Sequence, residues 1–290
     1  MQTLKVVTFN VLASAYADWQ ARRRVIAAEF ARLRPDIVAL QEVRTVPDAA
    51  EVSELLGPGW HIAPHIRTGP DGVGAILASR RPFGQVRHAD LEFNERAARF
   101  PWSGTLAAEI SLPPPFGPAL LVHHKPVFHC GFEYERERQA VLAARLVEDL
   151  VAERGHHVIV LGDFDAAPDT ASMRFWTGRQ SLDRTSVSYY DAWESAHPGE
   201  PGHTFTPENP LVRAGDMPLI PGRRIDYVLI RGTHYGPTLR VEACDRVFRT
   251  PDEHGVQASD HYGVLAELSV PSRPPGAMAP EMAAVTRAGV

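Results

Sequence analysis

Short apolar segments recur along the whole 290-residue chain, and this recurrence restricts its fold more than any other feature. Most of them are rich in valine and isoleucine and are bounded by glycine, proline or charged residues, as β-strands are. They lie at residues 5–9, 36–41, 73–78, 106–110, 119–122, 157–161, 225–230 and 263–268. We therefore expect a protein built on β-sheets.

Two longer segments have the periodicity of amphipathic helices. Residues 19–33 carry Val25, Ile26 and Phe30 at helical spacing, with arginines elsewhere, and residues 134–151 space their valines and leucines similarly. Helices and strands alternate in the first half of the chain, whereas the second half is mostly strand and loop. This order favours mixed sheets over a purely parallel sheet.

One large domain is the simplest organisation for this chain. Its 44% hydrophobic residues can bury a sizeable core, although its length also allows two smaller domains. The proline-rich segment 113–118 fits a turn between two strands and is too short for a domain linker. Residues 272–290 contain proline, alanine and glycine without a strong apolar period. We predict one domain over residues 1–271, followed by a loose C-terminal tail.

Charge and cysteine content restrict the partners and the compartment. Thirty Lys and Arg against 35 Asp and Glu leave a net charge of −5, the wrong sign for non-specific adhesion to polyphosphate, although a local basic groove stays open. Only Cys130 and Cys244 occur, which argues against a disulfide framework and leaves a single bridge open. We find no secretion signal and no apolar stretch near the roughly 20 residues of a membrane span. We expect a soluble, cytoplasmic monomer.

Acidic, amide and histidine residues stand directly beside the ends of several expected strands. Strand ends at one edge of a sheet are where loops converge into a site, so these side chains are expected to meet. An isolated aspartate in a loop is usually a turn or capping residue, but the whole set is harder to explain in that way. The set comprises Asn10, Glu42, Asp163, Asp165, Asp260 and His261.

The carboxylates of this set would repel one another strongly at close range without a compensating cation. Oxygen ligands without a cysteine pair or a helical histidine pair favour Mg²⁺ or Mn²⁺ over structural zinc, with Mg²⁺ as the first choice. Such an ion polarises a phosphoryl oxygen, a carboxylate takes a proton from attacking water, and histidines bond the phosphoryl oxygens. The residues therefore predict divalent-metal hydrolysis of a phosphoester.

Seven short motifs follow one another along the chain: TFNV at Asn10, LQEV at Glu42, GVGAILASR from Gly72, HHKP around His124, GDFD at Asp163 to Asp165, RIDYVL at Asp226, and SDHYGV at Asp260 and His261. Together and in this order they resemble the endonuclease/exonuclease/phosphatase superfamily, which includes DNase I-like nucleases, sphingomyelinases and inositol polyphosphate phosphatases. The resemblance covers most of the chain. It implies a four-layer α/β sandwich, with two mixed β-sheets packed face to face, helices outside, and a site in the cleft between the strand ends.

The resemblance assigns the metal side of the site. It implies that Glu42 is the principal metal ligand, with Asn10 and Asp260 completing or supporting the shell, and Asn10 is counted among the substrate-binding residues as well. For Glu42 an exposed loop acid is the alternative, but it follows an apolar run and matches the QE pair of the family. Leu12 stands where some nucleases of the superfamily carry another polar residue, so a one-metal core is expected.

The resemblance also assigns the phosphate side. Asp163 resembles the carboxylate that orients or deprotonates the attacking water, and His261 the imidazole that contacts the scissile phosphate. Asp226 resembles the acid that accepts a hydrogen bond from this imidazole and sets its tautomer. His124 matches a histidine that supports the phosphoryl group in the transition state. His123 would point to the opposite face of a continued strand, so only one of the two is expected in the cleft.

One position departs from the family pattern. GDFN reads GDFD here, so that Asp165 replaces an amide that could donate a hydrogen bond to phosphate, whereas an ionised acid only accepts. Asp165 is therefore a catalytic candidate with two alternative explanations: it binds a second metal, or the chain belongs to a subfamily in which aspartate is normal at this position. Asp165 also suggests an alternative to an enzyme, namely a non-catalytic relative that binds a phosphate ligand. The intact acids and histidine of the motifs argue against this alternative.

Segments outside the motifs are expected to select the substrate. Arg96 and Arg99 could grip phosphate, and His203 is a weaker candidate for substrate binding, with ordinary surface positions as the alternative. The acidic net charge favours a small or lipid-like phosphodiester or phosphomonoester, whereas the arginine-bearing loops keep an endonuclease or exonuclease as the rival. Aromatic side chains that could stack a base or cover an apolar group are Trp102, Phe128, Phe132 and Phe205.

Overall fold

Two mixed β-sheets form the centre of the computed structural model, which describes residues 2–154, 157–279 and 282. The first sheet has the order β12-β13-β1-β2-β4-β3 and contains β1 (Leu4–Asn10), β2 (Ile37–Arg44), β3 (His61–Pro64), β4 (Val73–Ser79), β12 (Arg240–Val247) and β13 (Gly263–Ser269). The second has the order β11-β10-β8-β7-β6-β5, with β9 beside β10, and contains β5 (Phe83–Ala89), β6 (Gly104–Ser111), β7 (Pro118–Lys125), β8 (His157–Asp163), β9 (Tyr189–Asp191), β10 (Asp226–Thr233) and β11 (Gly236–Pro237).

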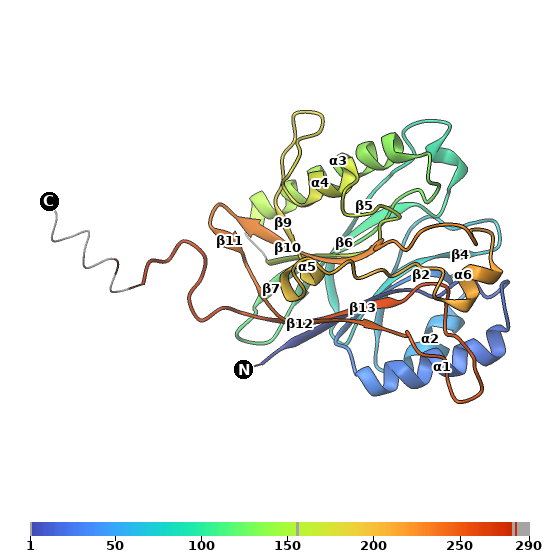
Figure 1. Cartoon of the computed structure of the whole chain (residues 1–290). Coiled ribbons are helices and arrows are strands. Elements are labelled where there is room, and N and C mark those ends of the chain that lie inside the picture. The colour runs from blue at the N-terminus through green and yellow to red at the C-terminus, as the bar shows by residue number, and fades with distance from the viewer. Residues whose placement is uncertain (1, 155–156, 280–281, 283–290) are drawn as a thin grey trace, which may run out of the picture.

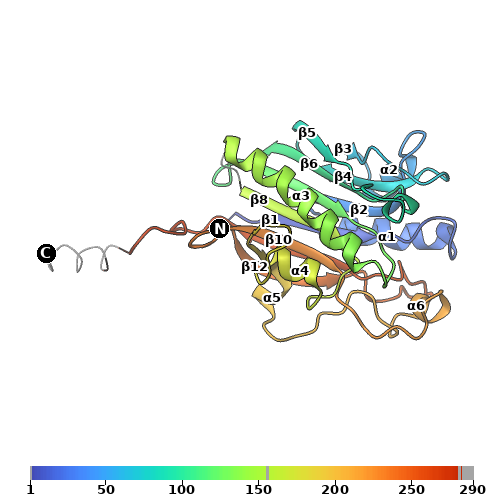
Figure 2. The same cartoon turned by 90° about the horizontal axis from the view of Figure 1, so that it is seen from above.

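Helices cover the outer faces of both sheets, as Figures 1 and 2 show. These covering helices are α1 (Trp19–Leu33), α2 (Ala50–Leu56), α3 (Glu133–Arg154) and α4 (Ala171–Trp176). The short helix α5 (Ala192–Ala196) packs into the core between the sheets, and α6 (Pro210–Ala214) packs in a small separate core with Phe205 and Ile225. One apolar core lies between the sheets, a second between the first sheet and α1 with α2, and a third between the second sheet and α3 with α4. The four-layer α/β sandwich is therefore confirmed.

The strands and helices expected from the sequence are all present. The eight apolar segments form β1, β2, β4, β6, β7, β8, β10 and β13, the two amphipathic segments form α1 and α3, and segment 113–118 connects β6 to β7. Five strands of the described chain were missed: β3, β5, β11 and β12 end the two sheets, and β9 pairs with β10 outside the main strand order. Edge strands expose part of both faces, as the half-exposed pattern of β5 and β12 shows, so their apolar signal is weak.

Helix α1 illustrates how the local sequence sets an element. The Asp18 side chain accepts a hydrogen bond from the Ala21 N–H at 3.0 Å, and Arg34 ends the helix in the left-handed conformation. Its inner face buries Ile26 and Phe30, as the periodicity predicted. Arg22 is buried on the same helix, however, whereas the pattern alone assigned the arginines to the outer face.

Side chains of β7 alternate between two layers. Leu121 belongs to the core between the sheets, whereas Leu120 and Val122 belong to the core under α3. By continuation, odd-numbered residues at the end of β7 face the space between the sheets and even-numbered residues face α3. This alternation decides which side chains of the HHKP motif reach the cleft.

The structure describes part of the C-terminal segment that was expected to be a loose tail. Residues 271–277, partly in the expected loose tail, lie beside Tyr235, and a Cβ atom on Gly276 would come within 2.8 Å of that ring. Apart from Met282, the tail beyond residue 279 lies outside the described residues.

Cys130 and Cys244 are both free thiols. Within the described part of the chain, no helix is long and apolar enough to cross a membrane.

Candidate active site

Sheet topology brings the motif residues to one end of the sandwich. β1 and β2 are parallel neighbours, so Asn10 and Glu42 emerge at the same edge. In the second sheet, β7 and β8 are parallel, and β10 runs antiparallel to β8 with Asp226 paired to Asp163. Because the two sheets pack face to face, these ends open into one cleft, as the sequence predicted.

Glu42 owes its position to an irregularity in β2. The register against β4 shifts between Gln41 and Val43, and Glu42 adopts a positive φ of 57°. A β-bulge with a residue in the left-handed region redirects one side chain out of the regular alternation, and such a conformation costs about 1–3 kcal/mol. The carboxylate of Glu42 therefore lines the pocket at the cleft.

Asn10 connects the two sides of the site. Its amide nitrogen donates to Glu42 Oε1 and to Asp163 Oδ2, each at 2.9 Å, and lies 3.5 Å from His261 Nε2. Its oxygen accepts a hydrogen bond from the Leu12 N–H at 3.0 Å. In this arrangement Asn10 supports the carboxylates rather than offering its oxygen to a cation.

Two polar side chains hold the loop that carries Asp260. Ser259 Oγ lies 2.8 Å from the Asn10 carbonyl and 3.1 Å from Asp260 Oδ1. The Asn209 side chain caps α6 through the Leu211 N–H, and its nitrogen donates to the Ser259 carbonyl at 2.9 Å and the Asp260 carbonyl at 3.0 Å. These contacts tie Asp260 both to β1 and to α6.

Arg22 is a positioning residue that the sequence did not reveal, because an arginine in an amphipathic helix ordinarily faces water. Its guanidinium donates to carbonyls of the loop after β1, including Val11 at 2.6 Å and Tyr16 at 2.8 Å. It also donates at 3.1 Å to the Ala258 carbonyl, two residues before Asp260. One buried side chain therefore links the loops behind Asn10 and Asp260.

We expect Arg22→Met to lower the free energy of unfolding by about 3 kcal/mol, because several buried carbonyls lose their donor. Urea unfolding followed by circular dichroism measures this loss. Arg24→Met is the matched control, since Arg24 is exposed on the same helix and its loss should stay within ~0.5 kcal/mol. Equal effects of the two substitutions would contradict the role of Arg22.

His261 and Asp226 form a buried pair. His261 Nδ1 lies 3.0 Å from Asp226 Oδ2, and Phe205 packs 5.0 Å from the imidazole, centroid to centroid. Burial lowers the pKa of His261, but the carboxylates of Asp226 and Asp163 outweigh it, so that the pKa lies well above its ordinary value. The pair therefore presents an imidazolium whose Nε2 faces the cleft side.

Asp163, Asp165 and Lys125 form a second buried cluster. Lys125 Nζ donates to Asp163 Oδ2 at 2.7 Å and to Asp165 Oδ2. Burial raises the pKa of Asp163, yet Lys125 and His261 bring it down to about 2, whereas burial and the neighbouring Asp163 raise the pKa of Asp165 to about 6. Lys125 was not selected from the sequence, although its place in the HHKP motif was visible.

The histidines of the HHKP motif point away from the pocket. The His124 ring packs against Phe164 and Trp176 under α3 and α4, with its Nδ1 2.7 Å from Thr105 Oγ1. His123, expected on the face away from the cleft, instead faces the space between the sheets, where it contacts Gln41 at 2.7 Å. The geometry therefore gives His124 no contact with a phosphoryl group, because the strand alternation turns it to the outer face.

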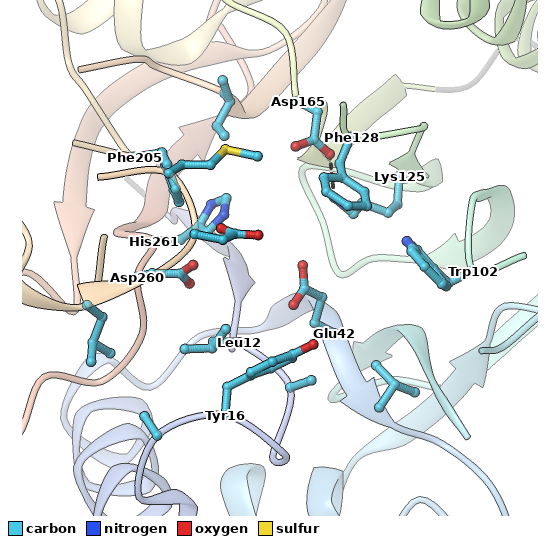
Figure 3. Close-up of a pocket in the computed structure, with 18 of the residues that line it drawn as sticks. Leu12, Tyr16, Glu42, Trp102, Lys125, Phe128, Asp165, Phe205, Asp260 and His261 are labelled. Atoms are coloured by element: carbon cyan, nitrogen blue, oxygen red, sulfur yellow. Dashed lines mark hydrogen bonds and ion pairs between the residues drawn. The ribbon is translucent and has the colours of Figure 1, made fainter. Parts of the chain in front are cut away.

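A pocket of about 550 Å³ lies over the acids (Figure 3). Lys125, Asp165, Glu42, Asp260 and His261 line one part of it. Apolar and aromatic side chains form most of the remaining wall: Leu12, Ala13, Tyr16, Val73, Trp102, Phe128, Phe205, Leu211 and Met217. Three of the four aromatic residues proposed from the sequence thus lie at this pocket, and Phe132 lines a neighbouring one.

Three side chains predicted to bind substrate, Arg96, Arg99 and His203, lie elsewhere. Arg96 pairs with Glu135 at 3.2 Å and stacks on Phe132, and Arg99 lines the neighbouring pocket. The His203 ring packs against Gly222, where a Cβ atom would come within 2.4 Å of its Nδ1. None of the three is among the residues that line the main pocket in the described chain. The pairing of Arg96 with the buried Glu135 depends on the fold, so the sequence alone does not reveal it.

Two groups of side chains could hold a divalent cation. Glu42 and Asp260 point into the same part of the pocket, and burial together with Glu42 raises the pKa of Asp260 (Figure 3). Asp163, Asp226 and His261 each place one possible ligand atom within 4.8 Å of the others. The second group already contains an imidazolium and contacts Lys125, so the carboxylates of Glu42 and Asp260 fit a cation better.

Comparisons with known proteins agree with this geometry. Sphingomyelin phosphodiesterase 2 of Homo sapiens is 25% identical over 266 residues, which cover 83% of this chain and 58% of the human protein. Inositol phosphosphingolipids phospholipase C of Schizosaccharomyces pombe is 24% identical over 308 residues, covering 93% and 69% of the two chains. The structure of D. rerio TDP2 complexed with single strand DNA product has a TM-score of 0.71 at 17% identity, covering 93% of this chain and all of that one.

The family assignment follows from a match over most of the chain. The model of the Endonuclease/Exonuclease/phosphatase family matches residues 7–261, from β1 to the His261 that closes the site. Six of the seven motifs lie entirely within this range, and the last, SDHYGV, lies within it up to His261. The chain belongs to the Endonuclease/Exonuclease/phosphatase family.

Proposed function

We propose that this enzyme hydrolyses a small phosphodiester that carries a lipid-like apolar group. The observation that carries the proposal is the wall of the main pocket, where apolar and aromatic side chains surround the acids. Its charged lining residues in the described chain are five acids, Glu42, Asp71, Asp165, Asp216 and Asp260, against Lys125, Arg223 and the imidazolium of His261. Such a pocket suits one phosphate with an apolar substituent better than a polyanionic strand.

The two curated relatives support the same substrate class, since their names specify sphingomyelin and inositol phosphosphingolipids. The chain spans only 58% of the human protein, so its substrate is proposed from the pocket as well as from the relative. Among phosphodiesters, we propose sphingolipid-like or glycerolipid-like esters with a compact head group.

The residues would divide the reaction between two sides of the pocket. Mg²⁺, the ion we propose for the oxygen ligands Glu42 and Asp260, would polarise a phosphoryl oxygen when bound. Asp163, kept ionised by its neighbours, orients the attacking water through a carboxylate oxygen. The imidazolium of His261, held by Asp226, donates a hydrogen bond to the phosphoryl group as negative charge accumulates there.

A substrate panel tests the proposal. Purified protein with Mg²⁺ is given sphingomyelin in mixed micelles, bis-nitrophenyl phosphate, nitrophenyl phosphate and supercoiled plasmid, each with and without EDTA. We expect turnover of the two small diesters, highest for the lipid, and its loss on chelation. Turnover of the monoester alone, or activity unaffected by EDTA, would contradict the proposal.

A nuclease remains the rival function, because Trp102 and Phe128 stand at the pocket and could stack a base. The plasmid arm of the panel decides between the two. Nicking at low enzyme concentration that weakens steeply with salt would favour a nuclease, since contacts with several phosphates release counterions.

Metal affinity provides a separate test of the site. We expect Glu42→Gln to raise the Mg²⁺ concentration that gives half-maximal activity by about 10-fold or more, because the site loses one charged oxygen ligand. The matched control is Glu54→Gln, a surface acid that pairs with Arg23 outside the site. An unchanged Mg²⁺ dependence of the Glu42 variant would place the ion elsewhere, with the Asp163, Asp226 and His261 group as the next candidate.

A further inference from the structure

The reaction proposed above gives a role to Asp163 but none to its two buried neighbours, Lys125 and Asp165. All three side chains are buried, and Lys125 is 2% exposed although it lines the main pocket. An ammonium group has three N–H donors, of which two bond Asp163 and Asp165. One donor therefore remains for a partner in the pocket.

The ammonium occupies the position that the motif led us to expect for a histidine. The alternation along β7 turns His124 under α3 and sends Lys125 into the space between the sheets, beside the end of β8. Asp165 has a positive φ of 52°, a conformation that aspartate tolerates better than most residues, and its carboxylate turns back to Lys125. Figure 3 shows this contact at the wall of the pocket, next to Phe128.

Asp165 cannot serve phosphate directly while it is ionised, because a carboxylate only accepts hydrogen bonds and repels an anion. Its carboxylate can instead hold the Lys125 ammonium in place. Without Asp165 the ammonium would pair with Asp163 alone and move toward the carboxylate that orients water. With both acids, Nζ is held between them.

We propose that Lys125 binds a non-bridging oxygen of the scissile phosphoryl group, and that Asp165 is the positioning residue that holds the Lys125 ammonium for this contact. The proposal rests on the phosphodiester hydrolysis proposed above. It also explains the change from GDFN to GDFD without a second metal: the donor that an amide at position 165 would supply comes from Lys125 instead. The positive charge stabilises the phosphoryl oxygens most when their negative charge is greatest, in the transition state.

A purely structural role of the cluster predicts a different result for the double variant that combines Lys125→Met with Asp165→Asn. If the cluster only joins the ends of β7 and β8, Lys125→Met is harmful because it leaves two buried carboxylates without a counter-charge. Removing the charge of Asp165 as well should then relieve the repulsion and restore both stability and activity. If Lys125 binds the phosphoryl group, the double variant regains stability and stays slow.

The experiment compares the wild type, Asp165→Asn, Lys125→Met and the double variant. Urea unfolding, kcat and KM with Mg²⁺, and the affinity for inorganic phosphate in EDTA are measured for each. We expect the double variant to unfold at a higher urea concentration than Lys125→Met, with kcat still about 100-fold below the wild type and phosphate bound about 10-fold more weakly. Asp165→Asn should lower kcat in the wild-type background and cause no further loss in the Lys125→Met background.

Two outcomes would overturn the proposal. A double variant whose kcat and phosphate affinity return to within about three-fold of the wild type would leave Lys125 a structural role only. A second loss of kcat when Asp165→Asn is added to Lys125→Met would show that Asp165 does not act through Lys125. If the wild type hydrolysed no phosphodiester, the proposed function would fail, whereas the phosphate titration in EDTA would still decide whether Lys125 binds phosphate.

Discussion

We expect His261→Gln to lower kcat roughly 10³-fold with little change in KM. Glutamine keeps a donor of similar length but loses the positive charge that Asp226 and Asp163 sustain on the imidazole. Because this charge opposes the negative charge that develops on the phosphoryl oxygens, its loss acts mainly in the transition state. Steady-state kinetics with bis-nitrophenyl phosphate at saturating Mg²⁺ measure the effect.

His203→Gln is the matched control for this substitution. His203 was a candidate from the sequence, but its ring packs against Gly222 outside the lining of the main pocket. We expect its kcat within about three-fold of the wild type. Similar losses in the two variants would mean that the effect comes from folding, and an active His261 variant would remove this residue from the chemistry.

The second large effect concerns stability in acid. His65 and His124 are buried, and desolvation is the main cause that lowers the pKa of each to about 3. In the unfolded chain both return to about 6.5, so the unfolded state binds protons that the folded state refuses. Their contribution to stability is complete above pH 6.5 and is lost as the pH falls from 6.5 toward 3. At pH 5 the loss is about 2 kcal/mol for each histidine.

Differences between variants isolate this contribution from the other titrating groups. The free energies of unfolding of the wild type, His65→Gln and His124→Gln are measured in urea at pH 7.5 and pH 5. Each variant should be about 2 kcal/mol more stable at pH 5, relative to the wild type, than it is at pH 7.5. Thr105→Val removes the partner of His124 Nδ1 without removing a titrating group, so its deficit should be equal at both pH values. If the difference in the free energy of unfolding between each histidine variant and the wild type were the same at both pH values, these rings would be protonated in the folded state at pH 5.

Much of the fold could be predicted from the sequence because buried strands and amphipathic helices have local signatures. β1 and β8 are continuous apolar runs between two cores, and α1 has both its capping residue and its buried stripe in the sequence. Edge strands such as β12 lack such a signature, since part of each face is exposed. The buried position of Arg22 had no local signature either, because its partners are backbone carbonyls that folding brings together.

The acidic side of the site was also visible in the sequence. Asn10, Glu42, Asp163 and Asp260 stand at strand ends, and parallel neighbouring strands in a sandwich carry their ends to the same edge. Their convergence follows from the topology, and the family resemblance carried by the order of the motifs implied the sandwich with a cleft at its strand ends.

Side-chain direction at the far end of a strand depends on register, which the motif letters do not contain. In HHKP, the alternation of β7 places His124 under α3 and Lys125 in the pocket, and a shift of one residue would have exchanged them. Likewise, only the parallel pairing of β7 with β8 in the second sheet brings Lys125 between Asp163 and Asp165. The residues beside the strands were therefore enough to predict a phosphoesterase site from the sequence alone. The tertiary structure decided that Lys125, and not His124, lines the pocket, because register and burial depend on contacts that no local pattern records.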